Sequence, residues 1–138
     1  MKVHQEQIEV SARGRGLHDV TEQIGRAVSR AGVRTGICTV FVQHTSASLV
    51  VQENADPAVL RDLERWAERI APENADYEHD AEGPDDMPSH IRAAFTRTTE
   101  TIPIRDGSLL LGTWQAIYLW EHRRSTHRRH LVVTVVGA

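Results

Sequence analysis

The sequence TTETIPIRDGSLLLGTWQAIYLWEHRRSTHRRHLVVTVV, from Thr98 to Val136, contains four β-rich segments in succession. Asp106-Gly107 lies between two apolar runs and is a strong signal for a β-hairpin. No helical pattern interrupts the stretch. Strands that follow one another without intervening helices favour an α+β fold over a doubly wound α/β fold. The predicted strands of this stretch are Thr98–Ile104, Ser108–Leu111, Ala116–Glu121 and Arg129–Val136.

Three helices and three further strands are predicted ahead of this stretch. One helix follows Asp19, an N-cap candidate preceded by a turn at Gly14–Gly16, and a second follows Asp56. A third helix is expected from Met87 to about Arg97. The chain therefore has about seven strands and three helices. The additional strands are Val3–Ala12, Gly36–Gln43 and Leu49–Gln52.

The length of 138 residues predicts one domain, residues 1–138, that is large enough to bury a hydrophobic core. Hydrophobic residues make up 40% and charged residues 25%, which disfavours disorder and coiled coils. No apolar run approaches the length of a membrane span, and the N-terminus lacks the apolar segment of a secretory signal. Cys38 alone cannot form an intramolecular disulfide. We expect a cytoplasmic protein without a membrane partner.

The charged residues are unevenly distributed along the chain. The net charge of −3 argues against a general nucleic-acid binder. Glu73–Asp86 holds seven acidic residues without Lys or Arg and is predicted to be an ordered loop. Glu121–His130 is rich in Arg and His, and we interpret its turn as a solvated hairpin end. The alternative, nucleic-acid phosphate contacts, lacks interleaved aromatic side chains and would use Arg123, Arg124, Arg128 and Arg129.

His44 is followed by three hydroxyl residues at the point where a predicted strand ends. Side chains in such a position line the rim of a sheet, and hydroxyls and backbone N–H groups of a turn can hold phosphate oxygens. An equally good interpretation is a polar turn whose hydroxyls bond their own backbone. The three hydroxyl residues are Thr45, Ser46 and Ser48.

Asp86 and His90 lie four residues apart at a predicted helix start. That spacing puts both on one face of the helix, where they can share a metal ion. Taken alone, the pair is better explained by a helix cap and an exposed His. His79 adds a further proton carrier from the acidic loop.

Trp114-Gln115 precedes another predicted strand. An exposed indole there can stack a planar ring while the amide binds the edge of that ring. Such a Trp is more often a core or interface residue. Glu53-Asn54 offers a carboxylate and an amide after a short strand, and Glu121 ends the strand that follows Gln115. As isolated residues, these are better explained as helix-start or surface ion-pair residues.

Taken together, four separated motifs resemble the YjbQ-like family, which carries the label secondary thiamine-phosphate synthase. They occur in the family's order and cover most of the chain, which makes the resemblance far more specific than any one motif. The motifs are Phe41–Leu49 (FVQHTSASL), Glu53–Pro57 (ENADP), Gly83–Ile91 (GPDDMPSHI) and Leu111–Ile117 (LGTWQAI), and the closing strand ending in Gly137 also matches.

The resemblance implies a compact α+β fold with an antiparallel-rich β-sandwich core, assembled as a homotrimer. It implies a divalent metal, zinc first, held by His44, Asp86 and His90. The implied reaction joins a pyrimidine diphosphate to a thiazole phosphate with loss of pyrophosphate. The candidate catalytic residues are Glu53, His79 and Glu121, and the candidate substrate contacts are Thr45, Ser46, Ser48, Asn54, Trp114 and Gln115.

Two other functions would use the same residues. A metal-dependent hydrolase of a small metabolite would use Glu53 or Glu121 as general base for a bound water. A non-enzymatic metal- or metabolite-binding protein would lose binding when His44 or His90 is replaced and would show no turnover. In each case the expected ligand is a small, phosphorylated or acylated molecule, and no nucleic acid is expected.

Overall fold

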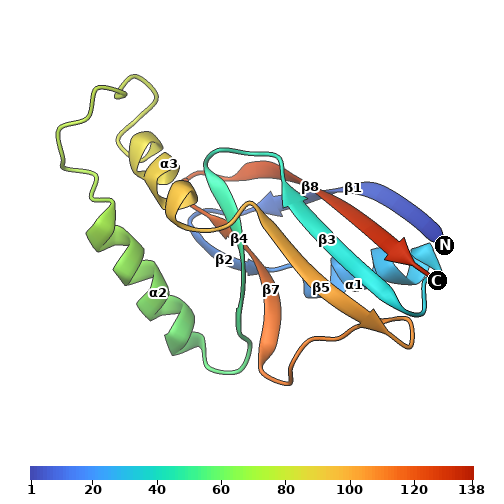
Figure 1. The fold of residues 1–138 in the computed structure, drawn as a ribbon. Helices are drawn as coiled ribbons and strands as arrows, with labels where there is room; N and C mark the ends of the chain where they lie inside the picture. Colours follow the sequence, from blue (N-terminus) through green and yellow to red (C-terminus); the bar gives the residue numbers. More distant parts are fainter.

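The computed structural model describes residues 1–138 and consists of two antiparallel sheets and three helices (Figure 1). The five-stranded sheet has the order β1-β8-β3-β5-β6 and the three-stranded sheet the order β2-β7-β4. This architecture confirms the predicted α+β fold. The first sheet contains β1 (Lys2–Ala12), β8 (His127–Gly137), β3 (Gly36–Val42), β5 (Thr99–Arg105) and β6 (Ser108–Leu109). The second contains β2 (Gly16–Asp19), β7 (Gln115–Glu121) and β4 (Ala47–Glu53).

The two sheets and helix α1 (Thr21–Ala31) share one hydrophobic core of 19 buried residues. Alternate residues of each strand face this core, because successive side chains of a strand point to opposite faces. Cys38 is one of them and behaves as a small core residue, as its apolar strand predicts. The other core residues of β3 and β8 are Val40, Val42, Leu131, Val133 and Val135.

Helices α2 (Pro57–Ile70) and α3 (Asp86–Phe95) lie on the side of the three-stranded sheet away from α1 (Figure 1). Glu64 of α2 joins them to the sheet. Its carboxylate accepts from Nε1 of Trp120 in β7 at 3.0 Å and from Nη2 of Arg92 in α3 at 2.5 and 2.6 Å. One carboxylate therefore holds both helices against the sheet. None of the three helices has the length and apolar stretch needed to cross a bilayer.

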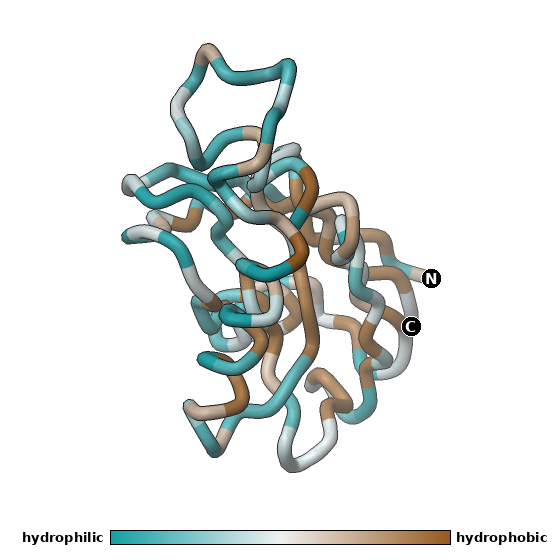
Figure 2. Tube along the Cα trace, turned by 90° about the vertical axis from the view of Figure 1, so that its left-hand side faces the viewer, coloured by the Kyte–Doolittle hydropathy of each residue, from teal (hydrophilic) through white to brown (hydrophobic).

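The acidic segment between α2 and α3 forms the long loop that Figure 2 shows in hydrophilic colours at the top of the molecule. Three contacts hold its first half. The hydroxyl of Tyr77 donates to the carbonyl of Pro72 at 2.6 Å, and Glu73 pairs with Arg15 at 3.2 Å and with Arg124. These contacts agree with the prediction of an ordered loop.

One strand was not predicted from the sequence. Strand β2 pairs with β7 where the sequence predicts only a turn at Gly14–Gly16. Four residues are too few to show a period-two pattern in the sequence. The strand is recognised only by its pairing with β7 in the folded chain. The capping prediction is also corrected: Val20 is the N-cap of α1 and makes no side-chain cap bond, while Asp19 accepts from the N–H of Thr21.

Candidate functional site

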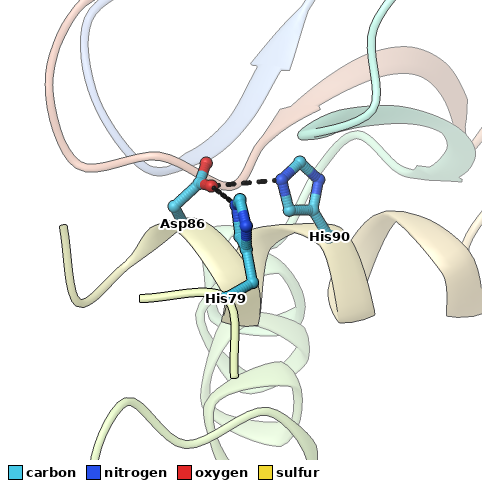
Figure 3. A group of neighbouring side chains, drawn as sticks. All are labelled: His79, Asp86 and His90. Carbon is cyan, nitrogen blue, oxygen red and sulfur yellow. Dashed lines mark hydrogen bonds and ion pairs between the residues drawn. The ribbon is translucent and has the colours of Figure 1, made fainter. Parts of the chain in front are cut away.

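Three potential metal-ligating side chains meet at the start of α3 (Figure 3). Asp86 begins the helix, His90 lies one turn later on the same face, and His79 approaches from the acidic loop. Oδ2 of Asp86 is 2.6 Å from Nε2 of His79 and 3.2 Å from Nε2 of His90. One ligand atom of each residue lies within 4.8 Å of the other two, so a single ion can contact all three.

A backbone contact determines which nitrogen His90 presents to this cluster. Its Nδ1 lies 2.8 Å from the carbonyl oxygen of Thr45, and a carbonyl only accepts, so Nδ1 carries the ring hydrogen. Nε2 of the neutral ring therefore directs a lone pair toward Asp86. Nε2 of His90 and Oδ2 of Asp86 are then both acceptors and cannot hydrogen-bond to each other, so a proton or another cation is needed between them. Metal-ligating histidines commonly donate their other nitrogen to a carbonyl in this way.

Arg123 completes the surroundings of Asp86, and sequence analysis missed it. Its Nη1 donates to Oδ1 of Asp86 at 2.8 Å, which leaves Oδ2 for the two imidazoles. Its Nε donates to Asp85 at 3.0 Å, so Asp85 is an ion-pair partner and not a side-chain cap of α3. The turn containing Arg123 is therefore more than a solvated hairpin end. No local pattern marks this residue, because its partners lie far away in sequence.

The charges around Asp86 keep its carboxylate ionised. Burial by itself would raise the pKa of Asp86, but the hydrogen bond from His79 and the charge of Arg123 help to lower it below its ordinary value. The same hydrogen bond raises the pKa of His79. An ionised carboxylate with two imidazoles is a donor set that suits a divalent cation such as Zn²⁺.

His44, predicted as the third metal ligand, lies outside this group. Its Nε2 accepts the backbone N–H of His130 at 2.8 Å, and its ring stacks on the ring of His130 with centroids 5.8 Å apart. A metal at Nε2 would have to displace that N–H. His79, which we placed among the catalytic residues, lies beside Asp86 and His90 instead.

The three predicted phosphate-binding hydroxyls differ in exposure and in their partners. Ser48 is fully buried, with its Oγ 2.8 Å from Nε2 of His122. The Oγ of Ser46 accepts from Nη2 of Arg129 at 2.9 Å, and Ser46 is buried as well. Thr45 is exposed and remains available to a ligand.

Glu121 and Arg129 form a buried ion pair where the sequence predicts a general base and a surface residue. Glu121 is fully buried and accepts from Nε of Arg129 at 2.7 Å. A carboxylate held in this way cannot take a proton from a bound water. A signal for Arg129 was present, because it continues the inward-facing alternation of Leu131 and Val133 in β8.

His122 joins α3 to the end of β7 through a second buried network. Nε of Arg92 donates to Nδ1 of His122 at 3.1 Å, so Nε2 carries the hydrogen and donates to Ser48. Burial first, and then the charge of Arg92, lower the pKa of His122 to about 2, so its ring is neutral. Both ring nitrogens are occupied, and His122 therefore cannot activate Ser48 as a nucleophile.

Four other predicted site residues gather at the opposite end of the β4–β7 pair. The register pairs Glu53 with Gln115 at this end and Ala47 with Glu121 at the other. Six residue steps along a strand span about 20 Å, so the two ends cannot form one small site within a chain. The side-chain amide of Asn54 donates to two backbone carbonyls, one in the loop before β7 and one at the first residue of β7. These bonds hold this end of the strand pair together. The four residues are Glu53, Asn54, Trp114 and Gln115.

A groove runs from the cluster toward β3. It consists of cavities of about 290 Å³ and 610 Å³, whose linings share His44, Thr45 and Thr98. His90 lines the smaller cavity and Arg129 the larger one, and no Asp or Glu lines either. The groove therefore offers hydrogen-bond donors next to a cluster that offers metal ligands.

A model of the UPF0047 YjbQ-like proteins matches residues 6–138. The chain belongs to the YjbQ-like family. A UPF0047 protein of Synechocystis sp. is 52% identical over 135 residues, which cover 97% of this chain and 92% of that protein. The UPF0047 protein YjbQ of Escherichia coli O157:H7 is 42% identical over 135 residues, covering 97% and 98% of the two chains.

Solved structures of YjbQ-like proteins share the fold. One from Sulfolobus solfataricus P2, described as a protein of unknown function, superposes with a TM-score of 0.90 at 30% identity over 99% of each chain. An uncharacterised family member from Clostridium acetobutylicum reaches 0.87 at 32% identity, covering 95% of this chain and 99% of its own. The family inferred from the four motifs is thereby confirmed.

Proposed function

We propose that this YjbQ-like protein is a metal-dependent transferase of small phosphorylated metabolites, of the thiamine-phosphate synthase type. The observation that carries the proposal is the His79–Asp86–His90 cluster, in which a backbone carbonyl turns the bare Nε2 of His90 toward Asp86. A cluster held in this way beside a groove is preorganised to bind a cation next to a small ligand.

The residues of the cluster fit a catalytic zinc ion better than a structural one. Two imidazoles and one carboxylate leave a coordination position open for a ligand. Arg123 holds the oxygen of Asp86 that the cluster does not use, and Thr45 orients His90. When bound, the ion would supply Lewis acidity to a phosphoryl oxygen and neutralise a departing pyrophosphate.

Transfer is favoured over hydrolysis by the positions of the acidic residues. The two carboxylates that the sequence offered as general bases are engaged elsewhere: Glu121 is buried against Arg129, and Glu53 lies at the far end of the β4–β7 pair. The carboxylate that a hydrolase with a general base would have near the cluster is that of Glu82, 3.1 Å from Nε2 of His79. Loss of pyrophosphate needs a cation and no carboxylate base.

Metal analysis followed by a coupling assay tests this function. Purified protein, reloaded with zinc, is compared with His90→Ala and Asp86→Asn, and with Glu53→Gln as the matched control at the far end. We expect near-stoichiometric zinc in the wild type and control, and an affinity loss of about 100-fold in the two cluster variants. The zinc-loaded protein is then given the pyrimidine diphosphate and the thiazole phosphate, and the coupled product is measured by mass spectrometry.

A wild-type protein that binds no divalent metal would remove the basis of the proposal. Hydrolysis of phosphorylated compounds without coupling, abolished by Glu82→Gln, would instead support the hydrolase. Tight metal binding with neither activity would leave a binding protein.

We also propose that the chain forms a homotrimer, as the family resemblance implies. The outer face of the five-stranded sheet exposes three large apolar side chains. Val3 of β1 and Ile37 of β3 both pair with Val136 of β8, which places these residues in one row across the sheet. Exposed apolar side chains gathered on one sheet face are typical of a protein interface. Light scattering should show a trimer that Ile37→Lys dissociates and Trp66→Lys, on α2, does not. The three apolar residues are Val3, Ile37 and Phe41.

A further inference from the structure

We propose that the groove beside the cluster binds a phosphoryl group of the ligand, with the ring N–H of His44 as a donor to it. This inference rests on the proposed function, because the metal cluster would engage one end of the ligand and the groove the other. It gives His44 a role different from that of a metal ligand and assigns a ligand-binding role to Thr98, which the motifs did not single out.

The first donor to the groove is the ring N–H of His44. The backbone N–H of His130 donates to Nε2 at 2.8 Å, so Nε2 is unprotonated and Nδ1 carries the hydrogen. Burial and the neighbouring charge of Arg129 lower the pKa of His44, so this neutral form is the stable one. A metal at Nδ1 would require loss of the last ring proton. An oxyanion only requires the N–H that is already there.

A second donor comes from a residue that is almost completely buried. The side chain of Arg129 is 4% exposed, and its Nε and Nη2 are bonded to Glu121 and Ser46. No buried side-chain nitrogen of the protein lacks a partner, so Nη1, which those bonds do not use, reaches the groove that Arg129 lines. A guanidinium anchored on two sides presents its remaining nitrogen in a fixed direction, as phosphate binding requires.

The lining of the groove is selective for a negative charge. The hydroxyls of Thr45 and Thr98 lie on its rim, and no carboxylate faces the ligand space to repel an anion. Glu121 balances the charge of Arg129 from behind, inside the core. An anion in the groove would therefore meet four donors: the hydroxyls of Thr45 and Thr98, Nδ1 of His44 and Nη1 of Arg129.

The groove and the cluster are coupled through Thr45. Its carbonyl accepts from His90, while its side chain lines the same 290 Å³ cavity as His44. A ligand whose phosphoryl group lies at His44 would extend toward the open position of the metal. Cavities of this size accommodate a metabolite and exclude a folded macromolecule.

Binding of inorganic phosphate to the metal-free, chelator-treated protein tests this subsite without the metal. Calorimetry compares the wild type with His44→Gln, which can still accept from His130 but has no donor at the Nδ1 position, and with His44→Asn, which keeps a donor there. Hydrogen bonds to a charged group are worth about 1.5–3 kcal/mol, so we expect a loss of at least about 10-fold for His44→Gln. We expect a smaller loss for His44→Asn, a loss for Thr98→Val, and no change for Thr113→Val at the far end.

Zinc affinity is measured on the same variants and should stay within about 3-fold of the wild type. The inference is overturned if metal-free wild type shows no saturable phosphate binding, if His44→Gln binds phosphate as the wild type does, or if His44→Gln loses zinc. Failure of the proposed function gives a different result, because wild-type protein would then not bind zinc whatever its phosphate affinity.

Discussion

His90 and His44 line the same cavity and offer opposite chemistry to it. Both neutral rings carry their hydrogen on Nδ1. His90 donates that hydrogen to the carbonyl of Thr45 and exposes a bare Nε2, whereas His44 uses Nε2 to accept from His130 and exposes the N–H. Two backbone groups therefore decide which histidine suits a cation and which suits an anion. The residue type alone cannot separate the two roles.

The same contrast extends to the regions around the two rings. The cluster is surrounded by acidic residues that Arg123 partly neutralises. The groove has no carboxylate in its lining, and Arg129 is neutralised from the core side. The regions lie side by side yet differ in the charge they favour. The predictions below test whether they are energetically and chemically separate.

The largest effect is expected for the ion pair beneath the groove. Glu121→Gln leaves the buried charge of Arg129 without its partner and should lower the free energy of unfolding by about 3–5 kcal/mol. Arg123→Met at the cluster should cost less, because Asp86 keeps His79 and His90 as partners. Urea denaturation measures the free energy of unfolding of both variants. Equal losses would show that the ion pairs of the groove and of the cluster contribute equally to stability.

Metal binding should follow His90 and not His44. His90→Ala removes a ligand atom and should lower zinc affinity about 100-fold, which corresponds to about 3 kcal/mol. His44→Ala should change it by less than about 3-fold. Competition with a chromogenic chelator gives both values, and similar losses in the two variants would restore His44 as a ligand.

Stability should fall as the pH drops below about 6.5, through His122. Its pKa in the folded protein is about 2, far below the value of about 6.5 expected when unfolded, so only the unfolded chain takes up the proton in this range. The free energy of unfolding should decrease by about 1 kcal/mol per pH unit from this residue. His79, whose pKa is raised, contributes with the opposite sign. Denaturation at pH 7, 6 and 5 should give a shallower slope for His122→Gln than for the wild type.

The smallest effect is expected at the far end of the β4–β7 pair. Trp114 is 64% exposed and touches neither region, so Trp114→Ala should change stability by less than about 0.5 kcal/mol. It should leave zinc and phosphate binding of a dissociated chain unchanged. A loss of phosphate binding in the trimer, with none in the dissociated Ile37→Lys variant, would place a neighbouring subunit's Trp114 at the groove.

Much of the fold follows from local patterns. The period-two alternation of β1, the β-branched residues of β3, the Asp106-Gly107 turn and the cap at Asp56 all signal their elements within a few residues. Strand β2 does not, because it depends on pairing with β7, 96 or more residues away in the chain. Its four residues carry too little information for a prediction.

The candidate site divides in the same way. The spacing of Asp86 and His90 places them on one face of α3, so this half of the cluster was predictable. His79 and Arg123 reach Asp86 from a loop and from a turn, and no periodicity links them to it. The predicted roles of Ser46, Ser48 and Glu121 required exposure, which the packing of β4 and β7 removes.

Motifs, alternation and helix spacing are properties of neighbouring residues, and for that reason the family, the α+β class and the pairing of Asp86 with His90 could be read from the chain. The folded arrangement was needed to find which nitrogen each histidine presents, which carboxylate is buried and which predicted residues lie about 20 Å apart. Those properties depend on backbone groups and charges brought together from distant segments, and a hydrogen bond between such segments leaves no periodic pattern in the chain.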